Sequence, residues 1–458
     1  MKTEPSLLDK YNVPVPRYTS YPPANHFREG FPEEEALRLI EQSNKGKPEH
    51  IALYFHIPFC KKICFYCGCN TSALKSGDQV DAYMKALHAE FDLVAERLDN
   101  TRKVSQLHFG GGTPNAIPTR YLAGIVDKVK TRFSFIPQPE IALETHPAYL
   151  DHTCLDAMTD AGFNRFSLGI QDFNETVLKM VNREPSQLPV GELIRRLRQK
   201  EGNRVNLDFI YGLPGQTTRS FTETIKQAID LSPDRLVTFS YAHVPWIKKH
   251  QQILEKRGLP GPKAKMEMFL AAREQLTGAG YIPIGLDHYV KPRDELNRAL
   301  EARLLHRNFQ GYCTRRTTGQ VYAFGTSAIS QLEGGYIQNT KSIPAYTNAL
   351  AQQHLPVEKG LKTSTDQVII REAITELMCN LQVRWEEVAN RLEISSAKLL
   401  DTLSPDEHRL KELEGDRLIR RGEKGIEVTG TGSLFIRNIA ATLDPAYQSK
   451  VQTYSKSV

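Results

Sequence analysis

Long apolar runs are scarce in this chain of 458 residues. Its longest apolar stretches, such as residues 51–55, are far shorter than the roughly twenty residues that a membrane-spanning helix needs. No apolar segment follows the first residues, 1–5, so the sequence predicts no signal peptide. We therefore expect no membrane partner and a cytoplasmic location.

Cysteine is also sparse, with seven residues in the chain. Four of the seven fall within ten residues, at Cys60, Cys64, Cys67 and Cys69, and the others are isolated. An odd count, one tight group and no export signal argue against a disulfide framework. The pattern instead predicts a metal or redox site in a reducing compartment.

Excess charge of either sign is small, because 59 Lys and Arg residues face 53 Asp and Glu residues, a net charge of +6. A mildly basic chain weakly favours anionic small molecules and selects none of them. The sequence has no run of like charge and no basic segment interleaved with aromatic residues. We therefore expect no nucleic-acid partner.

Apolar runs typical of β-strands alternate with helical patterns from about residue 50. Such alternation indicates an α/β protein whose parallel strands are joined by crossover helices. Six strands fit an open or partial barrel, because a closed barrel of this kind has eight. The predicted strands are Ile51–Phe55, Val104–Phe109, Glu140–Thr145, Arg165–Ile170, Val205–Tyr211 and Arg235–Tyr241. The predicted helices are Asp78–Leu98, Thr119–Arg132, Leu150–Ala161, Glu175–Val181, Pro189–Lys200 and Thr218–Leu231.

Two segments flank the predicted barrel and its extension, which together take residues 50–364. Residues 1–49 are rich in proline and irregular apart from a helix over Glu33–Gln42, and we expect this N-terminal extension to help cover the active site. Residues 365–458 form a smaller, mainly helical C-terminal domain.

The C-terminal domain resembles a winged helix in outline. A hairpin is predicted over Leu418–Thr429 and a helix over Ser433–Ala441. Its only basic cluster is Arg420-Arg421, so the outline favours packing or capping over DNA binding.

The cysteine spacing, Cys60-x3-Cys64-x2-Cys67-x-Cys69, directly follows the first predicted strand. Thiolates suit zinc or iron–sulfur centres. A structural zinc site normally takes four ligands in two separated pairs, and no second pair is present, so zinc would need a distant His. Three cysteines on a four-iron cluster would leave one iron open to a small ligand, which is the favoured interpretation.

Polar or glycine-rich residues follow each predicted strand. They should meet at one rim, where barrels of this kind carry their active sites. The glycines at 110–112 could let backbone groups approach a ligand or could form only a tight turn. Glu144 needs a partner if it is buried, and Asp208 could pair with a ribose hydroxyl or cap the next turn. The groups are Cys60–Cys69, Gly110–Pro114, Glu144–His146, Gln171–Asp172, Asp208 with Tyr211–Pro214, and Tyr241–His243.

The motif Cys60-x3-Cys64-x-Tyr66-Cys67 resembles the signature of the radical S-adenosylmethionine (SAM) superfamily. The resemblance implies a partial (βα)6 barrel in which Cys60, Cys64 and Cys67 hold one [4Fe-4S] cluster. It also implies that SAM binds the open iron while Tyr66 lies against the adenine. Reduction of SAM would release a 5′-deoxyadenosyl radical that takes a hydrogen atom from the substrate.

Further segments resemble one family within that superfamily, the oxygen-independent coproporphyrinogen III oxidases, also called coproporphyrinogen dehydrogenases. The resemblance covers nearly the whole chain. Gly68-Cys69 stands where the related haem-chaperone branch generally shows a different pair. The matching segments are Arg17–Pro22, Tyr54–Cys60, Cys67–Asn70, His108–Pro114, Asn164–Phe173, Val181–Glu184, Ile210–Thr217 and His306–Tyr312.

By resemblance, the chain would bind two SAM molecules. The first would contact Tyr54, Tyr66, Gly111, Glu144 and Ile329. The second would contact Gly112, Thr113, Gln171, Arg183, Asp208 and Ala242. Tyr54 and Cys69 are candidates for a catalytic role, and Cys69 could equally serve packing. His146 stands where the family usually carries Asp, and it could tune the first SAM site or replace a local hydrogen bond.

The implied reaction is oxidative decarboxylation of two propionates of coproporphyrinogen III to vinyl groups, which gives protoporphyrinogen IX in haem biosynthesis. It implies a flavodoxin- or ferredoxin-like electron donor and an unknown electron acceptor, and we expect a monomer. Four substrate carboxylates call for Arg or Lys, for which Arg17 and Arg307 are candidates. The alternatives are a haem-binding or haem-chaperone paralogue, another radical reaction on a porphyrin, and a zinc-stabilised winged-helix regulator.

Overall fold

Six neighbouring parallel strands form the centre of the protein. The computed structural model describes residues 5–46, 49–315 and 320–448. The strands lie in chain order in one sheet and all run in the same direction. They are β2 (Ile51–Ile57), β5 (Val104–Gly111), β6 (Phe135–Thr145), β7 (Arg165–Gln171), β8 (Arg204–Tyr211) and β9 (Arg235–Ser240). The predicted α/β partial barrel is therefore confirmed, although β6 begins at Phe135, earlier than the predicted Glu140.

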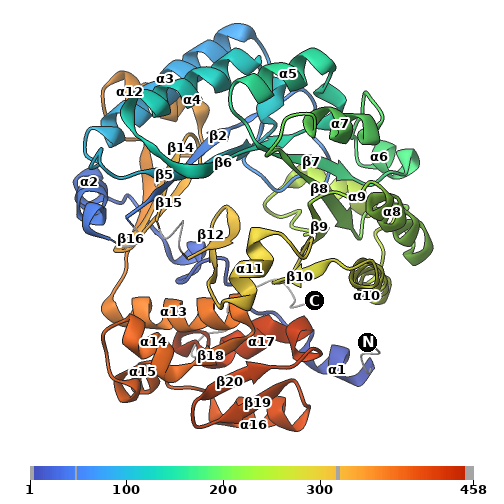
Figure 1. Cartoon of the computed structure of the whole chain (residues 1–458), viewed down its shortest axis with the longest axis vertical. Helices are drawn as coiled ribbons and strands as arrows, with labels where there is room; N and C mark the ends of the chain where they lie inside the picture. Colours follow the sequence, from blue (N-terminus) through green and yellow to red (C-terminus); the bar gives the residue numbers. More distant parts are fainter. Residues whose placement is uncertain (1–4, 47–48, 316–319, 449–458) are drawn as a thin grey trace.

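The crossover helices cover the outer side of this curved sheet (Figure 1). Their sequences explain the placement, because each is apolar on one face. In α4, Leu122, Ile125, Val126 and Val129 recur at helical spacing and are all buried. The helices are α3 (Gly77–Ala95), α4 (Thr119–Arg132), α5 (His152–Asp160), α6 (Glu175–Met180), α7 (Val190–Leu197) and α8 (Thr218–Asp230).

The sheet extends beyond the barrel strands on both sides, to thirteen strands in all among the described residues. On one side β14 (Val321–Phe324) runs parallel to β2 and is followed by antiparallel strands. On the other side β11 (His288–Val290) runs antiparallel to β9 and pairs with β10 (Ile282–Ile284). The further strands beyond β14 are β15 (Ile329–Leu332), β16 (Gly335–Asn339), β17 (Val357–Lys362) and β1 (Arg28–Glu29).

A small hairpin lies on the inner, concave side of the sheet. It consists of β12 (Leu305–Asn308) and β13 (Gly311–Thr314), and it follows α11 (Glu295–Glu301). Figure 1 shows the hairpin and α11 between the barrel strands and the C-terminal helices. The remaining elements of this half are β3 (Phe59–Cys60), β4 (Ser72–Ala73), α9 (Gln252–Glu255), α10 (Pro262–Gly278) and α12 (Ile343–Ala351).

The C-terminal part packs below the concave side of the sheet and is mainly helical (Figure 1). The predicted hairpin is present as β19 (Ile419–Gly422) and β20 (Gly425–Val428), joined by β18 (Gln382–Arg384). The predicted helix over 433–441 is interrupted, because only Ile436–Ala440 is α-helical and 3-10 turns flank it. The helices are α13 (Thr365–Asn380), α14 (Trp385–Arg391), α15 (Ser396–Leu403), α16 (Glu407–Gly415), α17 (Ile436–Ala440) and α18 (Pro445–Gln448).

The N-terminal segment binds to this C-terminal part. The predicted helix α2 (Glu33–Gln42) is present, but α1 (Pro5–Tyr11) lies in a stretch predicted to be irregular. Lys10 and Tyr11 of α1 donate to the Asp416 carboxylate at 2.5 and 2.6 Å. The division of the chain at residues 49 and 364 remains a prediction.

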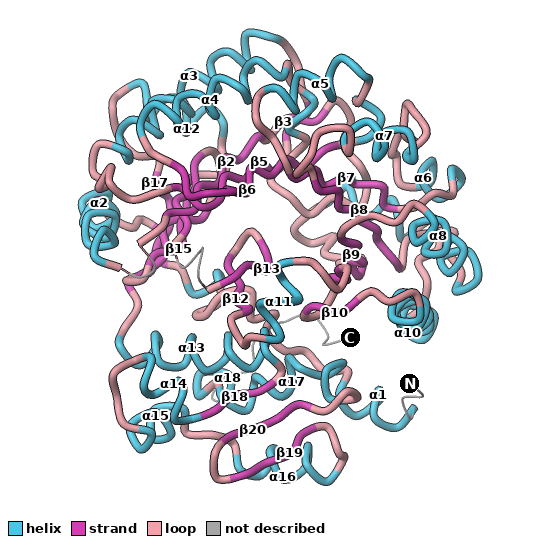
Figure 2. Tube along the Cα trace, in the orientation of Figure 1, coloured by secondary structure: helices cyan, strands magenta, loops and turns pink. Residues whose placement is uncertain are grey.

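In the barrel half of Figure 2, the strands lie inside the ring of crossover helices, and the apolar core lies between the sheet and these helices. Within residues 5–46, 49–315 and 320–448, none of the helices combines the length and hydropathy that a bilayer-spanning segment needs.

Candidate active site

The cysteine loop leaves the sheet at the end of β2 and is held in place by backbone contacts. Phe65 N–H donates to the Val181 carbonyl at 2.9 Å, and Cys67 N–H donates to the Cys64 carbonyl at 3.1 Å. Cys60 and Cys64 are buried, with 7% and 8% of their surface exposed. The loop therefore presents its thiols from a fixed backbone.

The donors around the thiols fit an iron–sulfur cluster. Thr113 Oγ1 lies 3.3 Å from Cys60 Sγ, and Arg183 Nη1 donates to Cys64 Sγ at 3.5 Å. Burial raises the pKa of the Cys60 thiol to about 11, whereas a hydrogen bond from Cys69 lowers the pKa of Cys67 to about 6. Iron replaces the thiol protons, and hydrogen bonds to sulfur tune such clusters. Among the described residues, no three His, Cys, Asp or Glu side chains converge closely enough for a single metal ion.

Arg183 joins the thiols to the neighbouring strand end. Besides Cys64, its guanidinium donates to the Tyr66 hydroxyl at 3.0 Å and to the Gly169 carbonyl. Arg183 is buried, with 8% of its surface exposed. A buried cation that is hydrogen-bonded to a thiol stabilises negative charge at the sulfur. The structure thus brings three of the predicted site residues into one contact network.

The glycines at the end of β5 leave no room for side chains. Gly111 has φ +115, and a Cβ there would lie 2.6 Å from the His56 ring. A Cβ on Gly112 would lie 2.6 Å from the Pro58 carbonyl oxygen. Both positions therefore need glycine. This requirement favours close approach of the backbone over a simple tight turn. The Gly111 N–H donates to the Glu144 carboxylate at 3.3 Å.

Glu144 has its partner in His108, whose Nε2 lies 3.1 Å from the carboxylate. Burial alone would raise the pKa of Glu144, but the hydrogen bonds from His108 and Gly111 lower it. The side chain lines a cavity of about 270 Å³ on the concave side of the sheet. Tyr54 packs against His108, with ring centroids 5.6 Å apart, and its hydroxyl lies 3.2 Å from His56 Nδ1. A carboxylate held here suits the amino group of a ligand.

Asp208 lines the same cavity from β8. Ser167 Oγ donates to its carboxylate at 2.7 Å. Burial raises the pKa of Asp208 to about 6, against the effect of that hydrogen bond. Because no backbone N–H of the following turn is bonded to it in the described contacts, the alternative role as a turn cap receives no support.

The other predicted ligand residues are spread around the rim. Gln171 ends β7 in the left-handed region, with φ +69, and its buried Oε1 has no hydrogen-bond partner among the described residues. Ala242 follows β9 and is exposed, and Ile329 begins β15 on the far side of β2. The Cys69 thiol donates a hydrogen bond to the Cys67 sulfur, which raises the pKa of Cys69 well above its usual value. The structure does not bring all of these residues into one contact network, so their roles remain predictions.

His146 forms a hydrogen bond with the backbone of its own turn. Its Nδ1 accepts from the Ala148 N–H at 3.2 Å, and its ring stacks on Tyr149 with centroids 4.6 Å apart. Burial and the nearby Arg183 lower its pKa to about 2, so the ring is neutral. An Asp side chain could accept the same hydrogen bond. Of the two interpretations of His146, replacement of a local hydrogen bond has the direct structural support.

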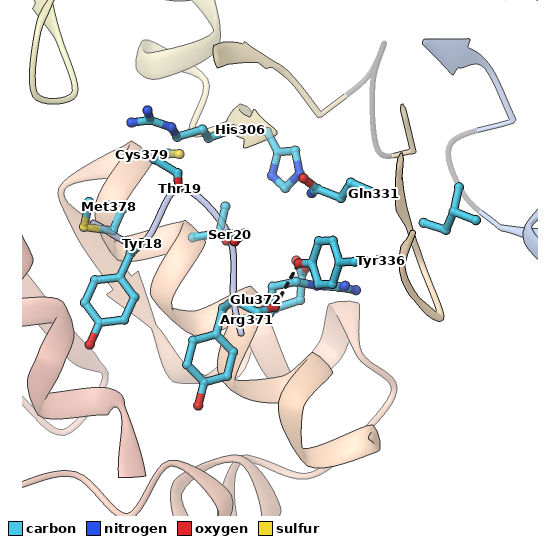
Figure 3. A pocket seen from close by; sticks show the side chains of 14 residues that line it. Tyr18, Thr19, Ser20, His306, Gln331, Tyr336, Arg371, Glu372, Met378 and Cys379 are labelled. Carbon is cyan, nitrogen blue, oxygen red and sulfur yellow. Dashed lines mark hydrogen bonds and ion pairs between the residues drawn. The ribbon is translucent and has the colours of Figure 1, made fainter. Parts of the chain in front are cut away.

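A second, smaller cavity of about 40 Å³ lies under the hairpin (Figure 3). Figure 3 shows Tyr18, Thr19 and Ser20 next to residues of α13, with His306 and Gln331 above. Arg307 lines both this cavity and the larger one. Three buried polar atoms from its lining have no hydrogen-bond partner among the described residues: His306 Nδ1, Arg307 Nε and Gln331 Oε1.

Sequence patterns missed several polar residues of the site. His56 and His108 lie inside apolar strands, and Ser167 of β7 donates to the carboxylate of the predicted Asp208 on the neighbouring β8. The signal was available, because Tyr54, His56 and His108 occupy positions that alternate with buried apolar residues along β2 and β5. His288 comes from β11, which was not predicted, and had no such signal.

Comparison with known proteins agrees with this geometry. The model of the "Radical SAM superfamily" matches residues 54–228. The chain is 40% identical over 455 residues to the oxygen-independent coproporphyrinogen III oxidase of Synechocystis sp., covering 99% of this chain and 97% of that protein. It is 37% identical to the Escherichia coli protein of the same name, covering 99% and 98%.

A solved structure is similar over the same length. It is the coproporphyrinogen III oxidase (HemN) from Escherichia coli, described as a radical SAM enzyme. The TM-score is 0.89 at 35% identity, and the match covers 97% of this chain and 99% of that one. With the cysteine loop, the strand-end residues and full-length similarity in agreement, the chain belongs to the oxygen-independent coproporphyrinogen III oxidase family.

Proposed function

We propose that this protein catalyses the oxidative decarboxylation of two propionates of coproporphyrinogen III to vinyl groups, giving protoporphyrinogen IX. The observation that carries the proposal is the continuous set of contacts from the thiols to the large cavity. Cys60 meets Thr113 of the glycine turn, and the turn holds Glu144, which lines the cavity. Family membership over the whole chain supports the same activity.

Cys60, Cys64 and Cys67 would hold one [4Fe-4S] cluster, with SAM at its open iron. When bound, these groups supply a radical that removes one hydrogen atom from the β carbon of a propionate. Loss of CO₂ and of one electron to an acceptor then completes each vinyl group. The chain's own contribution is to bind and orient the substrate and to exclude water.

The SAM-binding residues remain as proposed from the resemblance. A first SAM would contact Tyr54, Tyr66, Gly111, Glu144 and Ile329. In support, the lowered pKa keeps Glu144 anionic and able to accept from an ammonium group. A second SAM would contact Gly112, Thr113, Gln171, Arg183, Asp208 and Ala242. Asp208 and Gln171 support this site, because Asp208 lines the large cavity and the Gln171 amide oxygen has no partner among the described residues.

Arg307 is the proposed anchor for one substrate carboxylate. Its Nη1 donates to the Tyr312 hydroxyl at 3.0 Å, and Nε is buried without a partner among the described residues. Asp287 is a carboxylate whose charge raises the pKa of Arg307, but it is already hydrogen-bonded to His288 Nδ1 at 2.6 Å. The cavity of about 40 Å³ beside it is too small for a pyrrole ring and has room for a carboxylate. Arg17 is exposed and is not among the residues that line either of these two cavities.

Anaerobic turnover of coproporphyrinogen III tests the function. The reconstituted enzyme with SAM and dithionite should release CO₂ and form protoporphyrinogen IX, and iron and sulfide should be present in equal amounts. SAM cleavage without CO₂ would assign the chain to a haem-binding or haem-chaperone paralogue. Zinc without sulfide would exclude the radical reaction altogether.

We also propose that the protein is a monomer, that it lies in the cytoplasm, and that a flavodoxin- or ferredoxin-like protein donates electrons to the cluster. The free thiols support a reducing compartment. Size-exclusion chromatography with light scattering measures the molar mass in solution and tests whether the protein is a monomer.

A further inference from the structure

Residues 244–257 lie against the backbone of the cysteine loop. Three backbone carbonyls of the loop accept hydrogen bonds from this segment. Lys248 Nζ donates to the Cys69 carbonyl at 2.6 Å, His250 Nε2 to Cys67 at 2.9 Å, and Gln251 Nε2 to Tyr66 at 2.9 Å. Leu254 is buried in a small apolar cluster that also contacts Phe65 and Tyr66. The segment is therefore fixed to the loop that would carry the cluster.

The same segment presents two adjacent apolar side chains to solvent. Trp246 is 70% exposed and Ile247 is 68% exposed, the highest values among the large hydrophobic residues that the structure describes as exposed. Ile253, on the same segment, is 37% exposed. Single exposed apolar residues are common on proteins, but a contiguous apolar group typically marks an interaction site.

Basic residues follow these apolar side chains along the chain. The segment contains Lys248, Lys249, Lys256 and Arg257, against a single acid, Glu255. Glu255 is paired with His243 at 2.8 Å, so the excess positive charge is not balanced within the segment. Lys61 and Lys62, at the start of the cysteine loop, are also exposed. The segment thus combines exposed apolar side chains with an excess of positive charge, which is complementary to an acidic protein.

We propose that Trp246, Ile247 and Lys249, with Lys256, form the docking surface for an acidic protein that donates single electrons, of the flavodoxin or ferredoxin class. This inference rests on the proposed function, because the cluster must gain one electron for each SAM cleaved. Docking here brings the donor against the cysteine loop, which Lys248 and His250 connect to the segment. The donor is oxidised by one electron, and the cluster is reduced by one.

Two reductants distinguish a defect in donor docking from a defect in the active site. Trp246→Ser and Lys249→Glu are made in the full holoenzyme, and turnover of coproporphyrinogen III is driven either by dithionite or by a reduced flavodoxin of net negative charge. Dithionite is small and needs no docking surface. We expect both variants to lose about tenfold in kcat/KM for flavodoxin and to keep dithionite-driven turnover within about twofold. Leu400→Ser and Lys424→Glu, exposed in the C-terminal part, are the matched controls.

Binding gives a second readout. Association of flavodoxin with the holoenzyme should weaken in both variants and should weaken with rising salt in the wild type. Equal flavodoxin-driven rates in variants and controls would overturn the docking surface while leaving the function intact. A wild-type dimer that Trp246→Ser converts to a monomer would assign the surface to a second copy instead. Failure of dithionite-driven turnover in the wild type would contradict the function itself.

Discussion

At the scale of single residues, Arg307 stands out because a buried guanidinium normally has a full set of hydrogen-bond partners. Here Nε has none among the described residues, and the same side chain separates the large cavity from the small one. A propionate carboxylate would supply the missing acceptor. We expect Arg307→Gln to raise KM for coproporphyrinogen III about tenfold or more, with a smaller effect on KM for SAM. Steady-state assays with each substrate varied measure the difference.

Two further variants make this assignment to Arg307 specific. Arg307→Lys keeps the charge and should recover part of the affinity, because an ammonium can bind the carboxylate but not with two parallel bonds. Arg293→Gln removes the same charge from an exposed position and should leave KM for coproporphyrinogen III unchanged. If Arg307→Gln and Arg293→Gln give the same KM, Arg307 does not bind the substrate.

At the scale of elements, Glu90 joins α3 to the strands beyond the barrel. It is 2% exposed and accepts from Gly325 N at 2.7 Å, Asn339 Nδ2 at 2.5 Å and Tyr346 Oη at 2.5 Å. Burial raises its pKa from 4.5 to about 7, against the effect of these bonds. The protonated form is thus favoured by folding. The stability that Glu90 contributes is complete below pH 4.5 and is lost as the pH rises through 7.

This linkage predicts the pH dependence of unfolding. Relative to Glu90→Gln, the wild type should lose up to about 3 kcal/mol between pH 4.5 and pH 8. Urea unfolding of the apoprotein at several pH values measures the difference. Glu96→Gln, at the exposed end of the same helix, should show the same pH dependence of the free energy of unfolding as the wild type. A constant difference between wild type and Glu90→Gln would show that Glu90 does not titrate in this range.

The elements also show what the sequence could predict. The six barrel strands were predictable because each is an apolar run followed by an amphipathic helix, so the signal is local. Strands β14 to β17 were not, because they are only four to six residues long and β14 joins the sheet by pairing with the distant β2. The cysteine loop was predictable from spacing alone. The small cavity was not, because residues 18–21, 306–307 and 371–379 meet only in the folded chain.

At the scale of the whole molecule, the two ends of the chain meet over the concave side of the barrel. Asp444 accepts from the hydroxyls of Tyr18 at 3.0 Å and Tyr21 at 2.9 Å. Ala446 N donates to the same carboxylate at 3.0 Å. Tyr18 and Tyr21 also line the small cavity beside Arg307. The contact between the ends therefore positions one wall of the proposed substrate site.

Asp444→Ala should separate the N-terminal segment from the C-terminal part. Asp444 is 2% exposed, and its loss removes one shared acceptor from two buried hydroxyls and one N–H. We expect a loss of about 2–4 kcal/mol in the free energy of unfolding and faster proteolysis within residues 11–22. Asp401→Ala, at an exposed position of α15, should change neither quantity. Because Tyr18 and Tyr21 line the cavity, KM for coproporphyrinogen III should rise in Asp444→Ala as it does in Arg307→Gln. Unchanged proteolysis with unchanged KM would mean that the N-terminal segment is held by its other contacts and that Asp444 is dispensable.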